Sequence, residues 1–240
     1  MNIAAVIPAR YQSTRFPGKP LARILGKSMI QRVHEQAITA GCFADIIVAT
    51  DDHRIRDEVL AFGGHVEMTD KNIESGTERI WAVVEKTAFA AAVNIQGDEP
   101  LIGEGLLRDI CRALQDQSLV SAARLNDAYN DFISANVVKV VLDGRRQALY
   151  FSRAPIPFCE RGRFAGFFQH IGVYGYSRDM LQLFSRSPRC HLEQVEKLEQ
   201  LRFLTLGAAF HIVESDYVSQ GVDVPEDIEK IEKILRGSHG

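Results

Sequence analysis

Short apolar runs alternate with amphipathic, helix-length segments through about the first 115 residues, and this alternation limits the fold more than any other feature of the chain. The first run, Ile3–Ala9, is nearly continuous and contains Pro8, as is typical of a strand that is buried on both faces and leads into a loop. Similar runs lie at 46–49, 65–69 and 91–95. The alternation predicts a doubly wound α/β fold with a mostly parallel sheet, in which ligands bind beyond the carboxyl ends of the strands.

Helix-capping residues separate these apolar runs. Ser28, Asp52 and Ser75 stand where helices are expected to begin, because each side chain can accept a hydrogen bond from a backbone N–H of the first turn. Gly41 and Gly63 follow the corresponding apolar stripes and predict the ends of the first two helices. The loops after the first, second and fourth apolar runs therefore lie at strand carboxyl ends and are the predicted ligand-binding loops.

Antiparallel elements are predicted in the second half of the chain. The runs 137–142 and 147–152 flank a polar turn and predict a β-hairpin, and 170–176 predicts a further strand. The sequence contains no internal repeat and no linker. We therefore predict one domain, residues 1–236, that carries a small antiparallel insertion at about 120–215.

Two further helices are predicted near the end of the chain. The first ends at Gly207 and carries an apolar row made of Leu192, Val195, Leu198 and Leu201. The last helix starts with Pro225 at its first position and turns inward Ile228, Ile231 and Leu235. The apolar row and the insertion together predict a homodimer, and packing of the row within its own chain is the alternative. Residues 237–240 are set aside as an expression tail because they are short, polar and glycine-flanked.

Charge and composition exclude several classes of protein. The 240 residues include 28 Lys and Arg and 31 Asp and Glu, and the net charge of -3 argues against binding nucleic acid through bulk positive charge. No apolar stretch approaches the roughly 20 residues of a membrane helix, and no basic segment precedes the first apolar run. We expect a soluble, cytoplasmic protein without membrane insertion, and its four scattered cysteines are expected to be reduced.

A basic loop, residues 8–20, follows the first predicted strand. Its Arg10, Arg15 and Lys19 are suitable partners for phosphate oxygens, and Ser13 adds a hydroxyl. Neither a Walker loop nor a G-x-G-x-x-G fingerprint is present, so a polyphosphate would have to be held by a different cradle. A solvated basic loop has the same composition, and the residues alone leave both interpretations open.

The loop nevertheless carries a specific pattern. R-x-x-S-T-R-x-P-G-K-P resembles the signature of sugar nucleotidyltransferases, and the longer form I-P-A-R-Y-x-S-T-R-F-P-G-K-P-L is similar to the CMP-Kdo synthetase (3-deoxy-manno-octulosonate cytidylyltransferase) family. Further segments match in the same order between residues 3 and 235, at 48–52, 75–79, 94–100, 139–143, 148–153, 170–175, 198–202 and 221–223. The resemblance implies that the anomeric hydroxyl of Kdo attacks the α-phosphorus of CTP with Mg²⁺, releasing pyrophosphate, in lipopolysaccharide biosynthesis.

The resemblance also implies roles for individual residues. Nucleotide binding would fall to Pro8, Ala9, Arg10, Ser13, Arg15, Lys19, Ser75, Gly76, Thr77 and Arg79. The sugar acid would be held by Gln96, Arg153, His170, Tyr174, Glu199 and Gln200. The catalytic set would be Lys19, Asp98 and Asp223, with the two carboxylates as hard oxygen ligands for Mg²⁺. Arg153 is the expected partner of the sugar carboxylate.

Simpler interpretations exist for several of these residues when each is considered alone. Asp98 lies in a Gly-Asp-Glu-Pro turn, and Asp223 could cap the last helix. Ser75 is a typical helix start, and His170 is typical of a buried structural histidine. Glu199 and Gln200 could equally form the solvated face of a helix, so the resemblance alone supports their roles.

Three positions depart from the family pattern. Ile73 stands where a histidine is usual, Ala135 where a proline is usual, and Val224 where a threonine is usual. These differences leave the choice of sugar acid open between Kdo and a related acceptor such as 8-amino-Kdo. A non-catalytic nucleotide-binding module is the remaining alternative, and the family resemblance again implies a homodimer.

Overall fold

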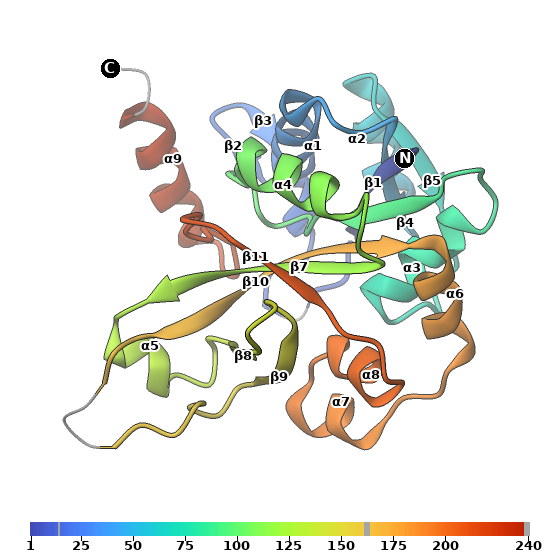
Figure 1. The fold of residues 1–240 in the computed structure, drawn as a ribbon. Helices are drawn as coiled ribbons and strands as arrows, with labels where there is room; N and C mark the ends of the chain where they lie inside the picture. Colours follow the sequence, from blue (N-terminus) through green and yellow to red (C-terminus); the bar gives the residue numbers. More distant parts are fainter. Residues whose placement is uncertain (14, 161–163, 238–240) are drawn as a thin grey trace.

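The computed structural model describes residues 1–13, 15–160 and 164–237. Thr14 of the basic loop and the tail residues 238–240 lie outside the described residues. Within the described residues a nine-stranded sheet runs through the molecule (Figure 1), with the main strand order β11-β7-β10-β6-β1-β4-β5. These strands are β1 (Ile3–Ala9), β4 (Asp45–Thr50), β5 (His65–Met68), β6 (Ala91–Asn94), β7 (Leu119–Asn126), β10 (Phe167–Ser177) and β11 (His211–Glu214).

The strands β6, β1, β4 and β5 are parallel, β11 is parallel to β7, and β10 is antiparallel to β6 and β7. Ala5 and Ile7 of β1 belong to one core cluster, whereas Ala4 and Val6 belong to the other. The first strand is thus buried on both faces, because its alternate side chains point to opposite sides of the sheet. The predicted α/β fold with a mostly parallel sheet is confirmed.

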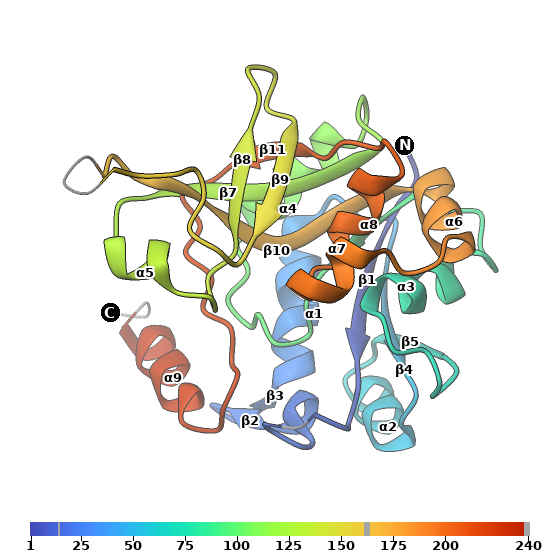
Figure 2. The ribbon, with the colours of Figure 1, turned by 90° about the horizontal axis from the view of Figure 1, so that it is seen from below.

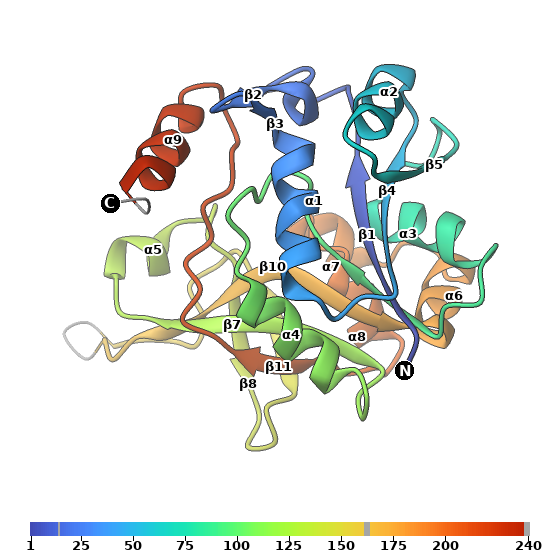
Figure 3. The same ribbon diagram turned by 90° about the horizontal axis from the view of Figure 1, so that it is seen from above.

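Helices cover the two faces of the sheet. One layer, in front of the sheet in Figure 3, consists of α1 (Met29–Ala40), α2 (His53–Ala61) and α4 (Glu104–Ala113). The opposite layer, in front in Figure 2, consists of α3 (Gly76–Val84), α6 (Arg178–Arg186), α7 (His191–Glu196) and α8 (Gln200–Thr205). Ser28, Asp52 and Ser75 accept the first-turn hydrogen bonds of α1, α2 and α3, so the three predicted helix starts are confirmed.

The predicted hairpin is also present, as β8 (Lys139–Leu142) and β9 (Ala148–Ser152). It branches from the main strand order, because β8 pairs only with β9 and with the start of β10. Between β7 and β8 lies the short helix α5 (Tyr129–Ile133). Strands β7 and β10, which lie within the range expected for an insertion, are instead central strands of the main sheet.

The prediction of one long helix carrying Leu192, Val195, Leu198 and Leu201 was wrong. Helix α7 ends at Glu196, and Lys197 takes the left-handed conformation with φ 54° and ψ 47° before α8 begins at Gln200. The break splits the apolar row, since Val195 is 65% exposed while Leu198 and Leu201 are buried in the core. The turn places the side chain of Glu199 at the start of α3, as described below.

The last helix, α9 (Asp227–Gly237), begins later than predicted and lies at one end of the molecule (Figure 1). The carboxylate of Asp227 accepts hydrogen bonds from the backbone N–H groups of Asp223 and Val224, at 3.0 and 3.1 Å. These bonds fix the turn that leads into α9, and Pro225 lies in this turn rather than in the helix. Ile231 of α9 packs with Val222 and with the β2–β3 region, formed by β2 (Arg23–Ile24) and β3 (Lys27–Ser28). No helix of the described residues is long and apolar enough to cross a membrane.

Candidate active site

A cavity of about 230 Å³ lies at the carboxyl ends of β1 and β6. We call it the β1-loop cavity, and its lining residues are Pro8, Ala9, Arg10, Gln12, Ser13, Lys19, Pro20, Glu74, Ser75, Gly76, Arg79, Gln96, Gly97 and Asp98. Eight of the ten residues expected to bind nucleotide are among them. Arg15 and Thr77 are the exceptions: Thr77 follows the lining residue Gly76, and Arg15 forms an ion pair with Asp223.

The basic loop is folded back on Tyr11. Gly18 has φ 73°, a left-handed conformation that glycine adopts without strain, and its N–H donates to the carbonyl of Tyr11 at 2.8 Å. A Cβ at Gly18 would lie 3.2 Å from the Tyr11 ring, and the guanidinium of Arg54 lies 3.3 Å from the centroid of the same ring. This fold carries Lys19 into the first turn of the short 3-10 helix η1 (Lys19–Leu21), at the wall of the cavity.

Lys19 joins three distant segments of the chain. Its Nζ lies 2.6 Å from Oδ2 of Asp98 and donates to the carbonyl of Val222 at 2.8 Å. The N–H of Val222 donates to the carbonyl of Asp98 at 2.9 Å, so the two segments also contact through their backbones. The next residue, Asp223, forms an ion pair of 3.0 Å with Arg15. The structure therefore brings both predicted metal carboxylates next to the basic loop.

Glu99 anchors the segment that leads to Asp223. Tyr217 donates to its Oε2 at 2.9 Å, and the hydroxyl of Ser219 donates to its Oε1. Burial raises the pKa of Glu99, and the hydrogen bonds from Ser219 and Tyr217 oppose that rise. The returning segment is thereby tied to the end of β6, where Asp98 lies.

Two carboxylates fit a magnesium site of the kind that substrate phosphates complete. No cluster of three or more candidate ligands occurs among the described residues. Mg²⁺ is commonly bound through one or two carboxylates together with substrate phosphates and waters, so a protein cage is not required. The donor chemistry of Asp98 and Asp223 fits this ion, and the two carboxylates form ion pairs with Lys19 and Arg15, respectively.

Asp51 organises the other side of the β1-loop cavity. Its Oδ2 lies 3.6 Å from Nε of Arg10 and 3.1 Å from Nη2 of Arg79. Arg79 is buried and also donates to the hydroxyl of Thr69 and, at 2.9 Å, to the carbonyl of Ile73. Burial is the main cause of the lowered pKa of Arg79. Arg79 thus holds the loop before α3, and its expected contact with nucleotide stays a prediction.

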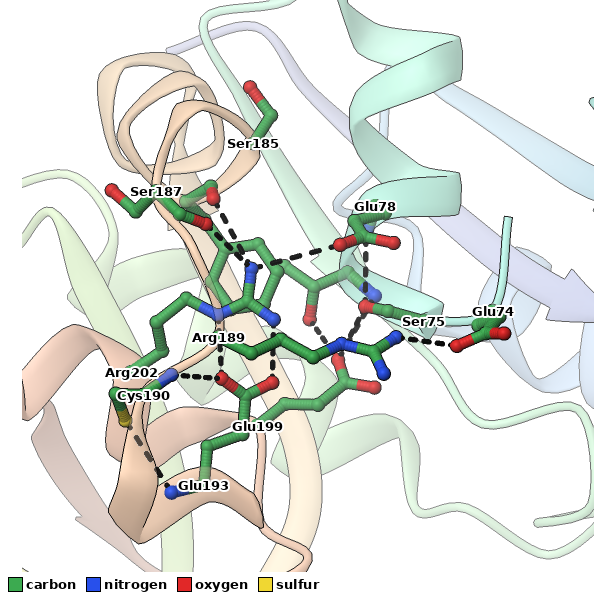
Figure 4. A network of polar contacts seen from close by, with 12 residues as sticks. Glu74, Ser75, Glu78, Ser185, Ser187, Arg189, Cys190, Glu193, Glu199 and Arg202 are labelled. Carbon is green, nitrogen blue, oxygen red and sulfur yellow. Dashed lines mark hydrogen bonds and ion pairs between the residues drawn. The ribbon is translucent and has the colours of Figure 1, made fainter. Parts of the chain in front are cut away.

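The start of α3 is tied to Glu199 (Figure 4). Oε2 of Glu199 accepts hydrogen bonds from the hydroxyls of Ser75 and Thr77, both at 2.8 Å. The N–H of Thr77 donates to the same oxygen at 3.4 Å, so the carboxylate lies at the N-terminus of a helix, where negative charge is stabilised. Glu199, expected to hold the sugar acid, therefore also fixes the turn that was expected to bind nucleotide.

The ion pairs of Arg202 stabilise the contact between Glu199 and the start of α3 (Figure 4). The guanidinium of Arg202 makes two hydrogen bonds to the carboxylate of Glu193, at 2.7 and 2.5 Å. Both side chains are buried, and Arg202 also lies 3.7 Å from Glu78 of α3. At the surface, Arg189 forms an ion pair of 2.7 Å with Glu74. These contacts fix helices α7 and α8 against the start of α3.

A second cavity, of about 220 Å³, adjoins the first. We call it the Tyr174 cavity, and its lining residues are Gly76, Thr77, Asn94, Gln96, Tyr174, Tyr176, Lys197, Leu198, Glu199 and Gln200. Gly76 and Gln96 line both cavities, so the two are neighbours. Four of the six residues expected to hold the sugar acid line the Tyr174 cavity, namely Gln96, Tyr174, Glu199 and Gln200.

His170 and Arg153 line a third cavity of about 320 Å³, which shares Tyr174, Leu198 and Gln200 with the second. His170 lies inside β10, with Nε2 2.9 Å from the hydroxyl of Ser121. Burial lowers its pKa to about 3, so the ring is neutral at physiological pH. The geometry agrees with a structural histidine, and its expected contact with a sugar acid stays a prediction.

The guanidinium of Arg153 is held by backbone carbonyls. Its Nε donates to the carbonyl of Glu196 and its Nη1 to the carbonyl of Ala135, both at 2.9 Å. Its backbone N–H donates to the carboxylate of Glu196 at 2.9 Å. Arg153 does not line the Tyr174 cavity, and its expected pairing with a sugar carboxylate stays a prediction.

Sequence reasoning gave no site role to four residues that line the Tyr174 cavity, namely Asn94, Tyr176, Lys197 and Leu198. Asn94 is the last residue of β6, and its side chain is 3% exposed. Lys197 lies at the helix break and lines this cavity from the surface. A signal for Asn94 was present in the sequence, because it is the polar residue at the end of an apolar run and stands directly before a predicted ligand-binding loop. The pattern gave no signal for Lys197, because the break itself was not predicted.

Comparisons with known proteins identify the family of this chain. Residues 4–214 match the family model described as Cytidylyltransferase. The chain is 47% identical to 3-deoxy-manno-octulosonate cytidylyltransferase of Syntrophotalea carbinolica, covering 99% of this chain and 100% of the relative. It is 46% identical to the enzyme of the same name from Syntrophobacter fumaroxidans, over 98% of this chain and 97% of the relative.

Solved structures were compared with this chain as well. A structure of CMP:2-keto-3-deoxy-manno-octonic acid synthetase complexed with CTP superposes with a TM-score of 0.94 at 38% identity, covering 99% of this chain and 100% of that one. A 4-diphosphocytidyl-2C-methyl-D-erythritol synthase from Anaerococcus prevotii has a TM-score of 0.67 at 13% identity, over 98% of each chain, and shares the fold alone. The family model and the near-full-length identities show that the chain belongs to the cytidylyltransferase family.

Proposed function

We propose that this protein transfers the cytidylyl group of CTP to Kdo, forming CMP-Kdo and pyrophosphate. The observation that carries the proposal is that Lys19 and Asp98 pair at the wall of the β1-loop cavity, and that Lys19 also contacts the carbonyl of Val222, next to Asp223. Relatives at 46–47% identity over nearly the whole chain are named for this reaction, which supports the same acceptor. The cytoplasmic location and the role in lipopolysaccharide assembly belong to the proposal and rest on the family resemblance.

The reaction brings an anionic sugar to an anionic triphosphate, so its main demand is charge neutralisation and alignment. Arg10, Arg15 and Lys19 supply cations at or beside the β1-loop cavity, and Asp98 and the carbonyl of Val222 hold the ammonium group of Lys19 there. Asp98 and Asp223 would hold Mg²⁺, which supplies further positive charge to the phosphate oxygens. The turn at Ser75 and Gly76 offers backbone N–H groups at a helix start to the nucleotide.

The acceptor would occupy the Tyr174 cavity. Because Gln96 lines both this cavity and the β1-loop cavity, the acceptor would lie next to the phosphates. Tyr174 and Tyr176 stack with ring centroids 6.0 Å apart and form one wall. Gln200 and Asn94 supply buried amides to the lining. A polyhydroxylated ligand suits such a wall, because hydroxyls both donate and accept hydrogen bonds.

The proposal is tested by measuring pyrophosphate release from CTP in the presence of Mg²⁺, with a panel of sugar acids and neutral hexoses as acceptors. We expect Kdo to be the best acceptor, neutral hexoses to be inert, and C8-modified analogues to retain some activity. A preference for 8-amino-Kdo by about tenfold or more would replace the acceptor and keep the chemistry. Absence of pyrophosphate release with every sugar acid would leave the non-catalytic nucleotide-binding module as the better reading.

We also propose that two chains form a homodimer. Supporting this, the surface around the β8–β9 hairpin and β7 exposes apolar side chains, with Leu125 66%, Leu149 60% and Phe158 91% exposed. The apolar row at 192–201 can contribute less to the dimer interface than predicted, because Leu198 and Leu201 are buried in their own chain. Light scattering at micromolar protein is expected to give twice the monomer mass of 26.8 kDa. A monomeric mass would refute the dimer.

A further inference from the structure

The chain between β11 and α9 carries Asp223 and has no regular secondary structure, as Figure 3 shows. We call residues 215–223 the returning segment. Within the described residues, its backbone is hydrogen-bonded to other backbone groups only near its two ends, at Ser215 and at Val222. A stretch without a ladder of backbone bonds is held in place by side chains. The position of Asp223 therefore depends on which side chains bind this segment.

Glu99 binds the middle of the returning segment. The hydroxyl of Tyr217 donates to its Oε2 at 2.9 Å, and the hydroxyl of Ser219 donates to its Oε1. The backbone N–H of Gln220 donates to the same carboxylate. A Cβ at Gly221 would lie 3.2 Å from Oε1 of Glu99, so the chain passes the carboxylate at close range. One side chain thus restrains the part of the segment that has no backbone-to-backbone bonds.

Glu99 and its neighbour Asp98 bind different parts of the site. The carboxylate of Asp98 lies against Lys19, at 2.6 Å from its Nζ, whereas the carboxylate of Glu99 lies against the returning segment. An ionised carboxylate only accepts hydrogen bonds, and both oxygens of Glu99 already have donors. Glu99 is therefore placed to act through the segment and not as a ligand of an ion.

The restraint from Glu99 extends to Asp223. Gln220, whose N–H binds Glu99, precedes Asp223 by three positions, and three residues span at most about 11 Å. Between them, the N–H of Val222 donates to the carbonyl of Asp98 at 2.9 Å. The two consecutive residues at the end of β6 therefore hold the stretch that carries the second carboxylate. Such support affects a metal site, because groups that orient metal ligands contribute to metal affinity.

An apolar anchor also holds the end of the returning segment. Val222 is buried in a small cluster with Ile24, Met29 and Ile231. If this packing alone fixed Asp223, the bonds from Glu99 would contribute to stability and not to metal binding. The two cases are distinguished by measuring nucleotide binding with and without the metal.

We propose that Glu99 is a positioning residue for Mg²⁺: it holds the returning segment so that Asp223 and Asp98 can bind the same ion together with the phosphates of CTP. This inference rests on the proposed function, because it takes Asp98 and Asp223 to be the carboxylates that hold Mg²⁺.

Calorimetry of CTP binding, in Mg²⁺ and in EDTA, tests this role without relying on turnover. Glu99→Ala removes every bond from this side chain to the returning segment. Its dissociation constant for CTP is expected to rise by about tenfold or more in Mg²⁺ but by less than about threefold in EDTA, because losing the support of a metal ligand weakens metal binding. Amide hydrogen exchange of residues 216–221 in the metal-free protein is expected to become at least about tenfold faster.

Two further variants separate positioning from charge and from folding. Glu99→Gln keeps an acceptor oxygen and adds an amide that can donate to a hydroxyl, so it is expected to stay within about threefold of the wild type in Mg²⁺. The double variant Tyr217→Phe/Ser219→Ala removes the two hydroxyl donors from the segment itself. It is expected to show the same loss as Glu99→Ala and replaces it as the probe if Glu99→Ala does not fold.

Glu104→Ala is the matched control. It removes a carboxylate of α4 that forms an ion pair of 3.1 Å with Arg108. It is expected to leave CTP binding unchanged in both media.

The outcomes distinguish this inference from the proposed function. Wild-type CTP affinity of Glu99→Ala in Mg²⁺ would overturn the role of Glu99 and assign the position of Asp223 to the packing of Val222, with the magnesium site intact. A loss in Glu99→Gln as large as that in Glu99→Ala would also overturn it, because charge and not hydrogen bonding would then be required. If Mg²⁺ does not strengthen CTP binding by the wild type, the proposed magnesium site fails and takes this inference with it.

Discussion

Lys19 is shared between the carboxylate of Asp98 and the carbonyl of Val222, and a bound triphosphate would compete for the same ammonium group. We expect Lys19→Ala to weaken CTP about 100-fold and CMP by less than about threefold, because only CTP carries the β- and γ-phosphates. Calorimetry with both nucleotides measures the difference. Lys27→Ala, which removes an exposed lysine paired with Glu35, serves as the control. Equal losses for CTP and CMP in Lys19→Ala would exclude this role.

Asp98 has no substitute among its neighbours, since Glu99 is engaged by Tyr217 and Ser219. Asp98→Asn is expected to lower kcat at saturating Mg²⁺ by at least about 100-fold, which corresponds to about 3 kcal/mol of transition-state stabilisation. The circular dichroism spectrum is expected to be unchanged. Asp109→Asn changes a half-buried aspartate of α4 that pairs with Arg112, and it is expected to be fully active. Near-normal turnover of Asp98→Asn would remove this residue from the mechanism.

The lowered pKa of His170 predicts how the free energy of unfolding depends on pH. Its folded-state pKa of about 3 lies below the ordinary value of 6.5, so the unfolded chain binds a proton at a higher pH than the folded chain does. Stability from this residue is therefore complete above pH 6.5 and is lost as the pH falls toward 3. Between pH 6 and pH 4 the free energy of unfolding is expected to fall by about 1.4 kcal/mol per pH unit from this source.

Urea unfolding at several pH values measures that loss. His170→Gln is expected to be less stable at pH 7 and to have a shallower pH dependence, since it removes the proton-binding group. His53→Gln changes an exposed histidine of α2 and is expected to keep the wild-type slope. A wild-type slope in His170→Gln would assign the pH dependence to other groups.

The helix break at Lys197 shows where the sequence pattern stops being informative about elements. A regular row of leucine and valine predicts one helix. The structure instead has two helices with a left-handed residue between them, and this arrangement buries Leu198 and Leu201 while it leaves Val195 exposed. Local pattern succeeded at Ser28 and Asp52, because a cap acts on its own first turn. It failed at Lys197 because the bonds from Glu199 to α3 join residues more than 120 positions apart.

The same residue gives a stability prediction. Lys197→Gly is expected to raise the free energy of unfolding by about 0.5–1 kcal/mol, because glycine adopts the left-handed conformation without the clash of a Cβ. Thermal or urea unfolding measures the change. Arg146, a second cationic residue with positive φ (65°), lies in the β8–β9 turn, and Arg146→Gly is expected to give a similar gain. A loss of stability in Lys197→Gly alone would show that its side chain makes a stabilising contact.

At the scale of the whole molecule, the sheet was predictable in part. The parallel strands β1, β4, β5 and β6 follow one another with helices between them, and right-handed crossovers leave few alternatives for their order. The position of β10 between β6 and β7 was not predictable, because antiparallel insertion of a late strand depends on contacts that no local pattern records. The residues of the basic loop were found from sequence, whereas the approach of Val222 to Asp98 required the fold.

The contact of Lys19 with Val222 spans 203 positions of the sequence. A chain emerging from the ribosome presents its basic loop and most of its strands well before the segment that carries Asp223. A chain that ends before Asp223 therefore contains Arg10, Arg15 and Lys19 but lacks the second of the two carboxylates proposed to hold Mg²⁺. If that proposal is right, such an unfinished or shortened chain is expected not to consume nucleotide.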